Sequence, residues 1–137
     1  EHGPKGGDEL NILSKGNNYG WPEITYGKNY TGTKITNYTH KDGMEQPVIH
    51  WTPSIAVCGM DFYDGKVFNN WKNNLLVTSL KFENLYRLEI GNKKVIKQEL
   101  ILSAGSRVRD VETGPDGFIY LAVEDPGRII RLRPHKK

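Results

Sequence analysis

Residues 57–102, VCGMDFYDGKVFNNWKNNLLVTSLKFENLYRLEIGNKKVIKQELIL, decide the fold class of this chain. They contain four short runs of β-branched, aromatic and aliphatic residues, at positions 57–63, 75–79, 85–90 and 96–102. Turn pairs follow the first and third runs: Asp64 with Gly65, and Gly91 with Asn92. Glycine supplies the positive φ that tight hairpins need. Four such runs in succession predict one antiparallel meander sheet.

The same pattern continues on both sides of this stretch. One more run lies upstream at 48–51, and three lie downstream at 108–113, 118–123 and 129–133. The runs recur about every ten residues, and no segment has the periodicity of an amphipathic helix, so the chain is predicted to be all-β. A four-stranded meander followed by a three-stranded sheet matches the blades of a β-propeller. A sandwich or a small barrel explains the strand count equally well.

Residues 1–45 differ in composition from the rest of the chain. They are rich in Gly, Asn, Tyr, Thr and Lys and show no sustained periodicity, which is typical of a long loop. Several aromatic residues argue that this loop is ordered, because disordered segments are poor in them. We therefore expect a long ordered loop over 1–45, one blade with a lead-in strand over 46–104, and a partial closing blade over 105–137.

Composition excludes several classes of function. The 137 residues carry a net charge of +3 from 19 basic and 16 acidic side chains, without the dense basic stripe of a nucleic-acid-binding protein. No apolar run approaches about 18 residues, so no membrane span is expected. Cys58 is the single cysteine, which excludes an intrachain disulfide and a multi-cysteine zinc site. Its apolar neighbours predict a buried thiol.

Four collinear motifs span nearly the whole chain. The first joins EHGPKGGDELN at 1–11 to GNNYGWP at 16–22; the others are NLLVTSLK at 74–81, RVRD at 107–110 and TGPDGFIY at 113–120. In this order they resemble the signature of the glucose/sorbosone dehydrogenase family, and within it the bacterial aldose sugar dehydrogenases. The resemblance implies a six-bladed β-propeller, of which this chain would be the C-terminal two to three blades.

The resemblance also implies a cofactor and a reaction. Members of the family bind pyrroloquinoline quinone (PQQ) and calcium (Ca2+) at the top of the central channel, and they oxidise aldose sugars at the anomeric carbon. The cofactor carries the redox chemistry. The protein must then hold a tricarboxylate quinone, supply a cation that polarises it, and supply a base for the sugar hydroxyl. A periplasmic or secreted location is implied as well.

Three cations and one aromatic residue match the family's cofactor-binding positions. Arg107 and Arg109 are two residues apart, so on a strand they point to one face and present two guanidinium groups to one anion. By resemblance they anchor the quinone together with Lys81. Trp51 matches an aromatic position beside the cofactor and the sugar, although a strand-end tryptophan packed between blades is an equally good interpretation.

The calcium positions also come from the resemblance. Gly3 and Pro4 match positions whose backbone carbonyls hold the cofactor-associated ion, in keeping with the preference of calcium for oxygen ligands. Glu9 and Tyr19 match a second, structural calcium site that combines a carboxylate with a backbone oxygen. Asp8 is near enough in sequence to assist either site.

The family's catalytic base has no counterpart in this sequence. In the family this base is a histidine in the N-terminal half, where an Arg-Asn pair also helps to hold cofactor and substrate. The chain begins at Glu1 without Met, and none of its histidines (His2, His40, His50 and His135) matches the base. We therefore expect a fragment or truncated form with no catalytic residue of its own and negligible turnover by itself.

Two other classes of function remain open on the sequence. The chain is alternatively a non-catalytic module, derived from a propeller, that binds calcium or carbohydrate. A surface for protein interaction rests on fold analogy alone. Two to three blades leave open sheet flanks, which predicts self-association or pairing with a missing N-terminal propeller half.

Overall fold

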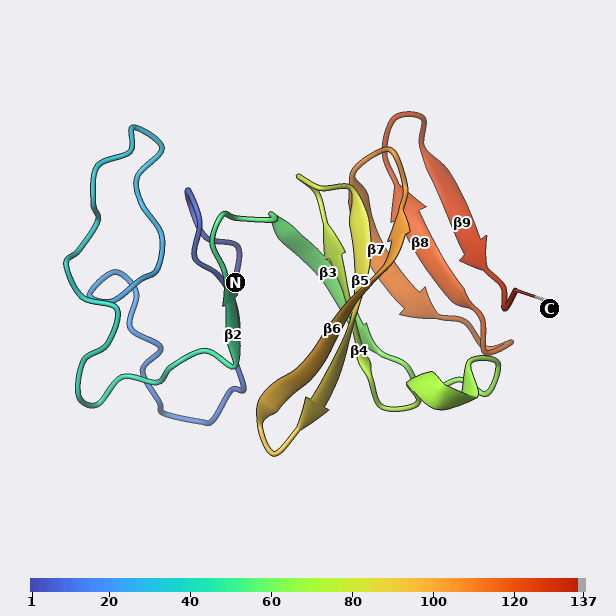
Figure 1. Cartoon of the computed structure of the whole chain (residues 1–137), viewed down its shortest axis with the longest axis horizontal. Coiled ribbons are helices and arrows are strands. Elements are labelled where there is room, and N and C mark those ends of the chain that lie inside the picture. Colours follow the sequence, from blue (N-terminus) through green and yellow to red (C-terminus); the bar gives the residue numbers. More distant parts are fainter. Residues whose placement is uncertain (136–137) are drawn as a thin grey trace. The chain divides into compact units, whose positions relative to one another are not determined.

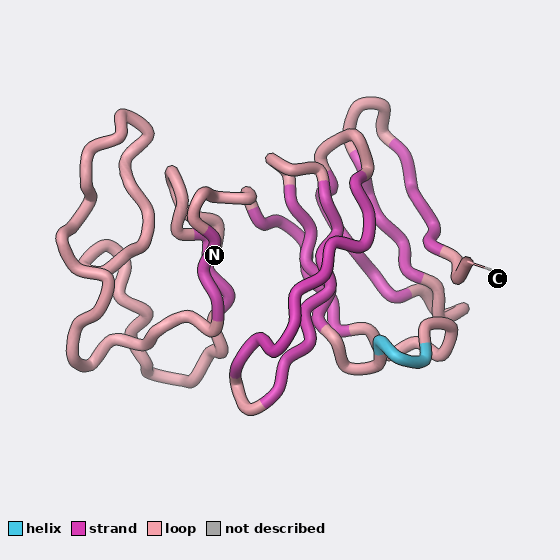
Figure 2. The backbone as a smooth tube through the Cα atoms, viewed as in Figure 1, coloured by secondary structure: helices cyan, strands magenta, loops and turns pink. Residues whose placement is uncertain are grey.

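A computed structural model describes residues 1–135 and divides the chain into two compact units, Glu1–Ala56 and Val57–Lys137. The first unit consists mostly of loops, and the second is built from two antiparallel sheets (Figures 1 and 2). No helix in residues 1–135 is long and apolar enough to cross a membrane. The units are described one at a time below.

The larger sheet of the second unit is a four-stranded meander. Its strands follow the order of the chain, so each strand pairs with the next one in sequence. They are β3 (Val57–Phe62), β4 (Leu75–Ser79), β5 (Asn84–Gly91) and β6 (Lys94–Ser103). A short 3-10 turn, η1 (Asn69–Trp71), lies between β3 and β4. The predicted meander over 57–102 is confirmed, and each strand bound falls within two residues of its predicted position.

The smaller sheet has three strands in the same sequential order. They are β7 (Val108–Thr113), β8 (Ile119–Val123) and β9 (Arg128–Leu132). The predicted runs over 108–133 are therefore confirmed as well. A four-stranded meander followed by a three-stranded sheet is the arrangement expected of successive propeller blades.

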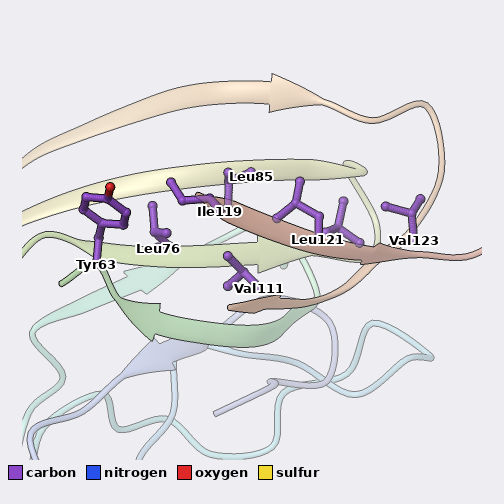
Figure 3. Close-up of a cluster of buried hydrophobic side chains, with 8 residues drawn as sticks. Tyr63, Leu76, Leu85, Val111, Ile119, Leu121 and Val123 are labelled. Carbon is purple, nitrogen blue, oxygen red and sulfur yellow. The ribbon is translucent and has the colours of Figure 1, made fainter. Parts of the chain in front are cut away.

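The two sheets pack face to face around one apolar core. Figure 3 shows the side chains that fill it, which come from β3–β4, β5, β7 and β8. The core residues are Tyr63, Leu76, Leu85, Val108, Val111, Ile119, Leu121 and Val123. All of them are at most 4% exposed, and burying an aliphatic side chain of this size stabilises a fold by about 1.5–3 kcal/mol. This core holds the two blades together as one unit.

Strands β3 and β7 run side by side in the same direction. A Cβ atom added at Gly59 would lie 2.7 Å from the Cα of Asp110. Further along both strands, the carboxylate of Asp61 accepts hydrogen bonds from the backbone N–H (2.9 Å) and the hydroxyl (2.7 Å) of Thr113. The first strands of the two sheets therefore start at the same end of the unit.

Both strands carry a β-bulge at that shared end. The pairing of β3 with β4 shifts between Val57 and Met60, and the pairing of β7 with β8 shifts between Val108 and Asp110. Thr78, fully buried on β4, stabilises the first bulge: its hydroxyl donates to the Gly59 carbonyl (3.2 Å) and accepts from the Gly59 N–H (2.8 Å). Bulges redirect neighbouring side chains and are common beside active sites.

Cys58 lies in the first bulge and is exposed, so the predicted buried thiol is wrong. Along β3 the exposed residues alternate with half-buried ones, and Cys58 shares the exposed set with Met60 and Phe62. Apolar neighbours in the sequence do not tell which face of a strand is covered, because successive side chains point to opposite faces.

The first unit is an ordered loop region with one small sheet. Its strands, β1 (Asp8–Leu10) and β2 (Ile49–Trp51), pair antiparallel. Asp8 is completely buried; its carboxylate accepts hydrogen bonds from the Gly3 N–H (2.8 Å) and the Ser54 hydroxyl (2.9 Å). This carboxylate joins segments 46 residues apart in sequence and replaces the regular hydrogen bonding that the loop lacks.

Candidate cofactor and calcium sites

The three cations assigned from the sequence lie at one end of the second unit. Strands β4 and β8 run antiparallel to β3 and β7, so they end, at Ser79 and Val123, where β3 and β7 begin. Lys81 follows the end of β4, while Arg107 and Arg109 lie at the start of β7. The topology therefore brings together the cations that the sequence assigned to one anionic ligand.

The two arginines converge on Glu124, which follows the last residue of β8. The Arg109 guanidinium donates to Glu124 Oε1 through Nε at 2.6 Å and through Nη2. Arg107 Nη1 lies 4.0 Å from Glu124 Oε2. Arg109 falls at the bulge and both arginines are exposed, so the simple argument that residues two apart share a strand face does not apply here. One carboxylate brings the two guanidinium groups together instead.

The cations at this end differ in their electrostatic partners. The hydrogen bond that Arg109 donates to Glu124 is the main cause that raises the pKa of Arg109, and the Cys58 sulfur adds to the rise. Lys81 is exposed, with its Nζ 5.5 Å from the centre of the Phe82 ring. Within residues 1–135 no carboxylate forms an ion pair with Lys81. Glu124 thus pairs with the two arginines, while Lys81 lies at the same end of the unit without an ion pair among the described residues.

The four residues assigned to calcium line a single hollow in the first unit. It has a volume of about 520 Å³, and Gly3, Pro4, Glu9 and Tyr19 all contribute to its wall. His2, Trp21 and Thr25 belong to the same wall. The sequence had assigned these four residues to two separate sites, and the structure brings them together around one space.

Glu9 lines this hollow, and the Asn11 side chain contacts Glu9 from outside the set of lining residues. The Asn11 side-chain nitrogen donates to Glu9 Oε2 and to Glu1 Oε1, both at 3.3 Å. Asn11 Oδ1 is buried and has no hydrogen-bond partner among the described residues. Burial raises the pKa of the Glu9 carboxyl above its ordinary value of 4.5, and the Glu1 carboxylate raises it further. A bound cation would favour the charged form of Glu9.

Two side chains near the hollow, those of Tyr19 and Asp8, already form hydrogen bonds within the protein. The Tyr19 hydroxyl donates to the Ile12 carbonyl (2.9 Å) and accepts from the Ser14 N–H (2.6 Å), which leaves the backbone oxygen as the possible ligand of this residue. Asp8 holds the loops together from inside the unit. Within residues 1–135 no three His, Cys, Asp or Glu side chains form a metal cluster, so a calcium ion would need backbone and amide oxygens as well.

Trp51 is mostly buried. It lies in β2 with 8% of its surface exposed, and its carbonyl accepts from the Gly7 N–H at 2.9 Å. Trp51 therefore offers a ligand only a small part of its surface. Its contact with a cofactor stays a prediction.

The comparisons with known proteins agree with the motifs. The family model for glucose/sorbosone dehydrogenases matches residues 1–131. The chain belongs to this family. Aldose sugar dehydrogenase YliI of Escherichia coli K12 is 44% identical over 138 residues, which cover 98% of this chain and 37% of the relative.

Solved structures of the family contain the same fold. The crystal structure of the soluble aldose sugar dehydrogenase of E. coli, in its apo form, matches with a TM-score of 0.91 at 41% identity, over 98% of this chain and 40% of that chain. The PQQ-bound aldose sugar dehydrogenase of Streptomyces coelicolor matches with a TM-score of 0.68 at 23% identity, over 96% and 37%. The sheets of this chain are thus β-propeller blades, and the chain spans about two-fifths of the relatives' length.

Sequence reasoning missed Glu124 and Asn11. A signal for Glu124 was present: in an antiparallel hairpin, the residue after the second strand returns to the start of the first, where the arginines lie. Asn11 gave no such signal, because its role depends on how an irregular loop folds around Glu9. His50, to which no role was assigned, stacks on Tyr26 with ring centres 3.7 Å apart.

Proposed function

We propose that this chain forms part of a PQQ-dependent oxidoreductase that oxidises aldose sugars at the anomeric carbon. In this proposal it contributes residues that anchor the cofactor and residues that bind calcium. The observation that carries it is the convergence of Lys81, Arg107 and Arg109 at one end of the second unit. Family membership supports it. The organisation into a loop region (1–45), a blade with a lead-in strand (46–104) and a partial closing blade (105–137) is part of the proposal.

The cations fit a ligand with several carboxylates. Arg107 and Arg109 together offer two planar guanidinium groups that match carboxylate geometry, and Lys81 adds a third positive charge without a fixed direction. When bound, PQQ would supply the quinone that accepts electrons from the sugar. The role of the chain here is to bind and orient this group, with Trp51 as the proposed aromatic neighbour.

The hollow of the first unit fits calcium. Glu9 and the Tyr19 carbonyl are proposed as ligands of a structural ion, and the position of both residues in the wall of the hollow supports this assignment. The Gly3 and Pro4 carbonyls are proposed to hold the cofactor-associated ion. A hard cation with six to eight oxygen ligands suits such a mixed set of carboxylate and backbone oxygens.

We assign no catalytic residue to this chain. Its histidines do not match the family's base, so the proton acceptor for the sugar hydroxyl must come from elsewhere in a complete propeller. We propose that residues 1–137 by themselves have negligible turnover, that they self-associate or pair with a propeller half that carries the base, and that the protein works in the periplasm or outside the cell.

Titration calorimetry with the full chain tests the proposal. Saturable binding of PQQ in the presence of calcium is the expected result, and dye-coupled oxidation of glucose by the chain alone is expected to stay at background. Absence of PQQ binding would contradict the cofactor role. Glucose turnover by residues 1–137 with added PQQ and calcium would contradict the missing base.

The hollow lined by Glu9 favours a second candidate function. A non-catalytic module that binds calcium or carbohydrate would keep the Glu9 site and have no use for the quinone. In the same titrations this alternative predicts heat from calcium and none from PQQ, so the two functions are separated by one pair of measurements.

A further inference from the structure

Glu124 is bound to the arginine pair through both its backbone and its side chain. Its N–H donates to the Arg107 carbonyl at 3.0 Å. Its carboxylate accepts the Nε and Nη2 donors of Arg109 and lies 4.0 Å from Arg107. The residue therefore joins the end of β8 to the start of β7 at the point where the β7 bulge turns the chain.

The contacts with Glu124 and with the Cys58 sulfur leave part of the Arg109 guanidinium available. A guanidinium has five N–H donors, and Glu124 accepts two from Arg109. Both side chains remain partly open to solvent, with 44% of Arg109 and 34% of Glu124 exposed. An anion can therefore reach the remaining donors while Glu124 keeps its own contacts.

A fixed arginine binds a shaped anion better than a mobile one. Ordering a flexible side chain at binding costs free energy, and a bidentate contact needs the guanidinium plane in one orientation. A spherical or tetrahedral inorganic anion gains less from this order, because it depends mainly on charge. Glu124 thus has two opposing effects: it reduces the positive charge, and it fixes the direction of Arg109.

We propose that Glu124 is a positioning residue that orients Arg109, and through it the arginine pair, for a planar polycarboxylate. The inference rests on the proposed function, since PQQ is the polycarboxylate assigned to this end of the unit. In this inference Glu124 makes the arginine pair selective for the shape of the ligand, in addition to balancing its positive charge.

The test compares two probes, PQQ and inorganic phosphate, on wild type, Glu124→Gln and Glu124→Asp. Glu124→Gln removes the charge and keeps the size, and we expect PQQ to bind roughly fivefold more weakly while phosphate binds as well or better. Glu124→Asp restores the carboxylate and should recover part of the PQQ affinity. Glu112→Gln is the matched control: it removes one exposed negative charge towards the far end of β7 and should leave both affinities unchanged.

The outcomes separate the inference from the proposed function. If wild type does not bind PQQ, both are overturned. If wild type binds PQQ and Glu124→Gln binds it equally well or more tightly, only the inference is overturned, because Glu124 then acts as a counter-ion. Unfolding curves of each variant that match wild type ensure that the affinities report on the site.

Discussion

At the residue scale, the fold disfavours the charged form of Glu9, and a bound cation would favour it. Burial raises the pKa of its carboxyl above 4.5. When the pKa of a carboxyl is higher in the folded than in the unfolded state, protonation of this carboxyl stabilises the folded state. The contribution is complete below the unfolded-state pKa and is lost as the pH rises through the folded-state pKa. Calcium should cancel this loss, because it favours the charged carboxylate.

We therefore expect calcium to stabilise the chain more at pH 7 than at pH 4.5. A ligand at about 100 times its Kd adds about 2.7 kcal/mol, and most of this should disappear at the lower pH, where protons compete for Glu9. Glu9→Gln should abolish the calcium effect and, without calcium, should be at least as stable as wild type at pH 7. Thermal unfolding at both pH values measures this; an equal calcium shift in Glu9→Gln would exclude Glu9 as a ligand.

At the element scale, the paired bulges of β3 and β7 depend on Gly59. A Cβ there would meet the Asp110 backbone at 2.7 Å, closer than packed atoms allow. Gly59→Ala should therefore destabilise the second unit by about 1–3 kcal/mol, the usual cost of overpacking. Denaturant unfolding measures the change. Gly127→Ala is the control, because nothing lies within 4 Å of a Cβ at Gly127; equal effects of the two substitutions would contradict the packing account.

The strands were predictable from the sequence, and the bulges were not. Alternating apolar runs and glycine turns predict strand positions well, because they depend on local conformation. The bulge at Arg109 and the pairing of β1 with β2 depend on contacts between distant segments. The motifs assigned Lys81, Arg107 and Arg109 to one ligand, which stays a prediction, whereas the carboxylate that contacts both arginines became visible only in the folded chain.

At the scale of the whole molecule, exposed apolar side chains on β3 and β9 predict self-association. Met60 is 63% exposed, Phe62 57% and Ile129 68%. Exposed apolar groups on the strands of an incomplete sheet assembly favour further packing or pairing. Light scattering should detect species larger than the monomer, and Met60→Lys with Phe62→Lys should reduce them. A stable, monodisperse wild-type monomer would contradict this prediction.

The central claim is that the cationic end of the second unit binds a quinone with several carboxylates. The most direct test is a PQQ titration of wild type and of the double variant Arg107→Ala with Arg109→Ala. Lys66→Ala with Lys94→Ala is the control, because it removes two exposed charges at the opposite end of the sheets.

Charge-assisted hydrogen bonds contribute about 1.5–3 kcal/mol each, so the arginine double variant should bind PQQ roughly tenfold or more weakly, and the lysine double variant should bind like wild type. Equal PQQ affinity in the arginine variant and wild type, or equal losses in both double variants, would contradict the account.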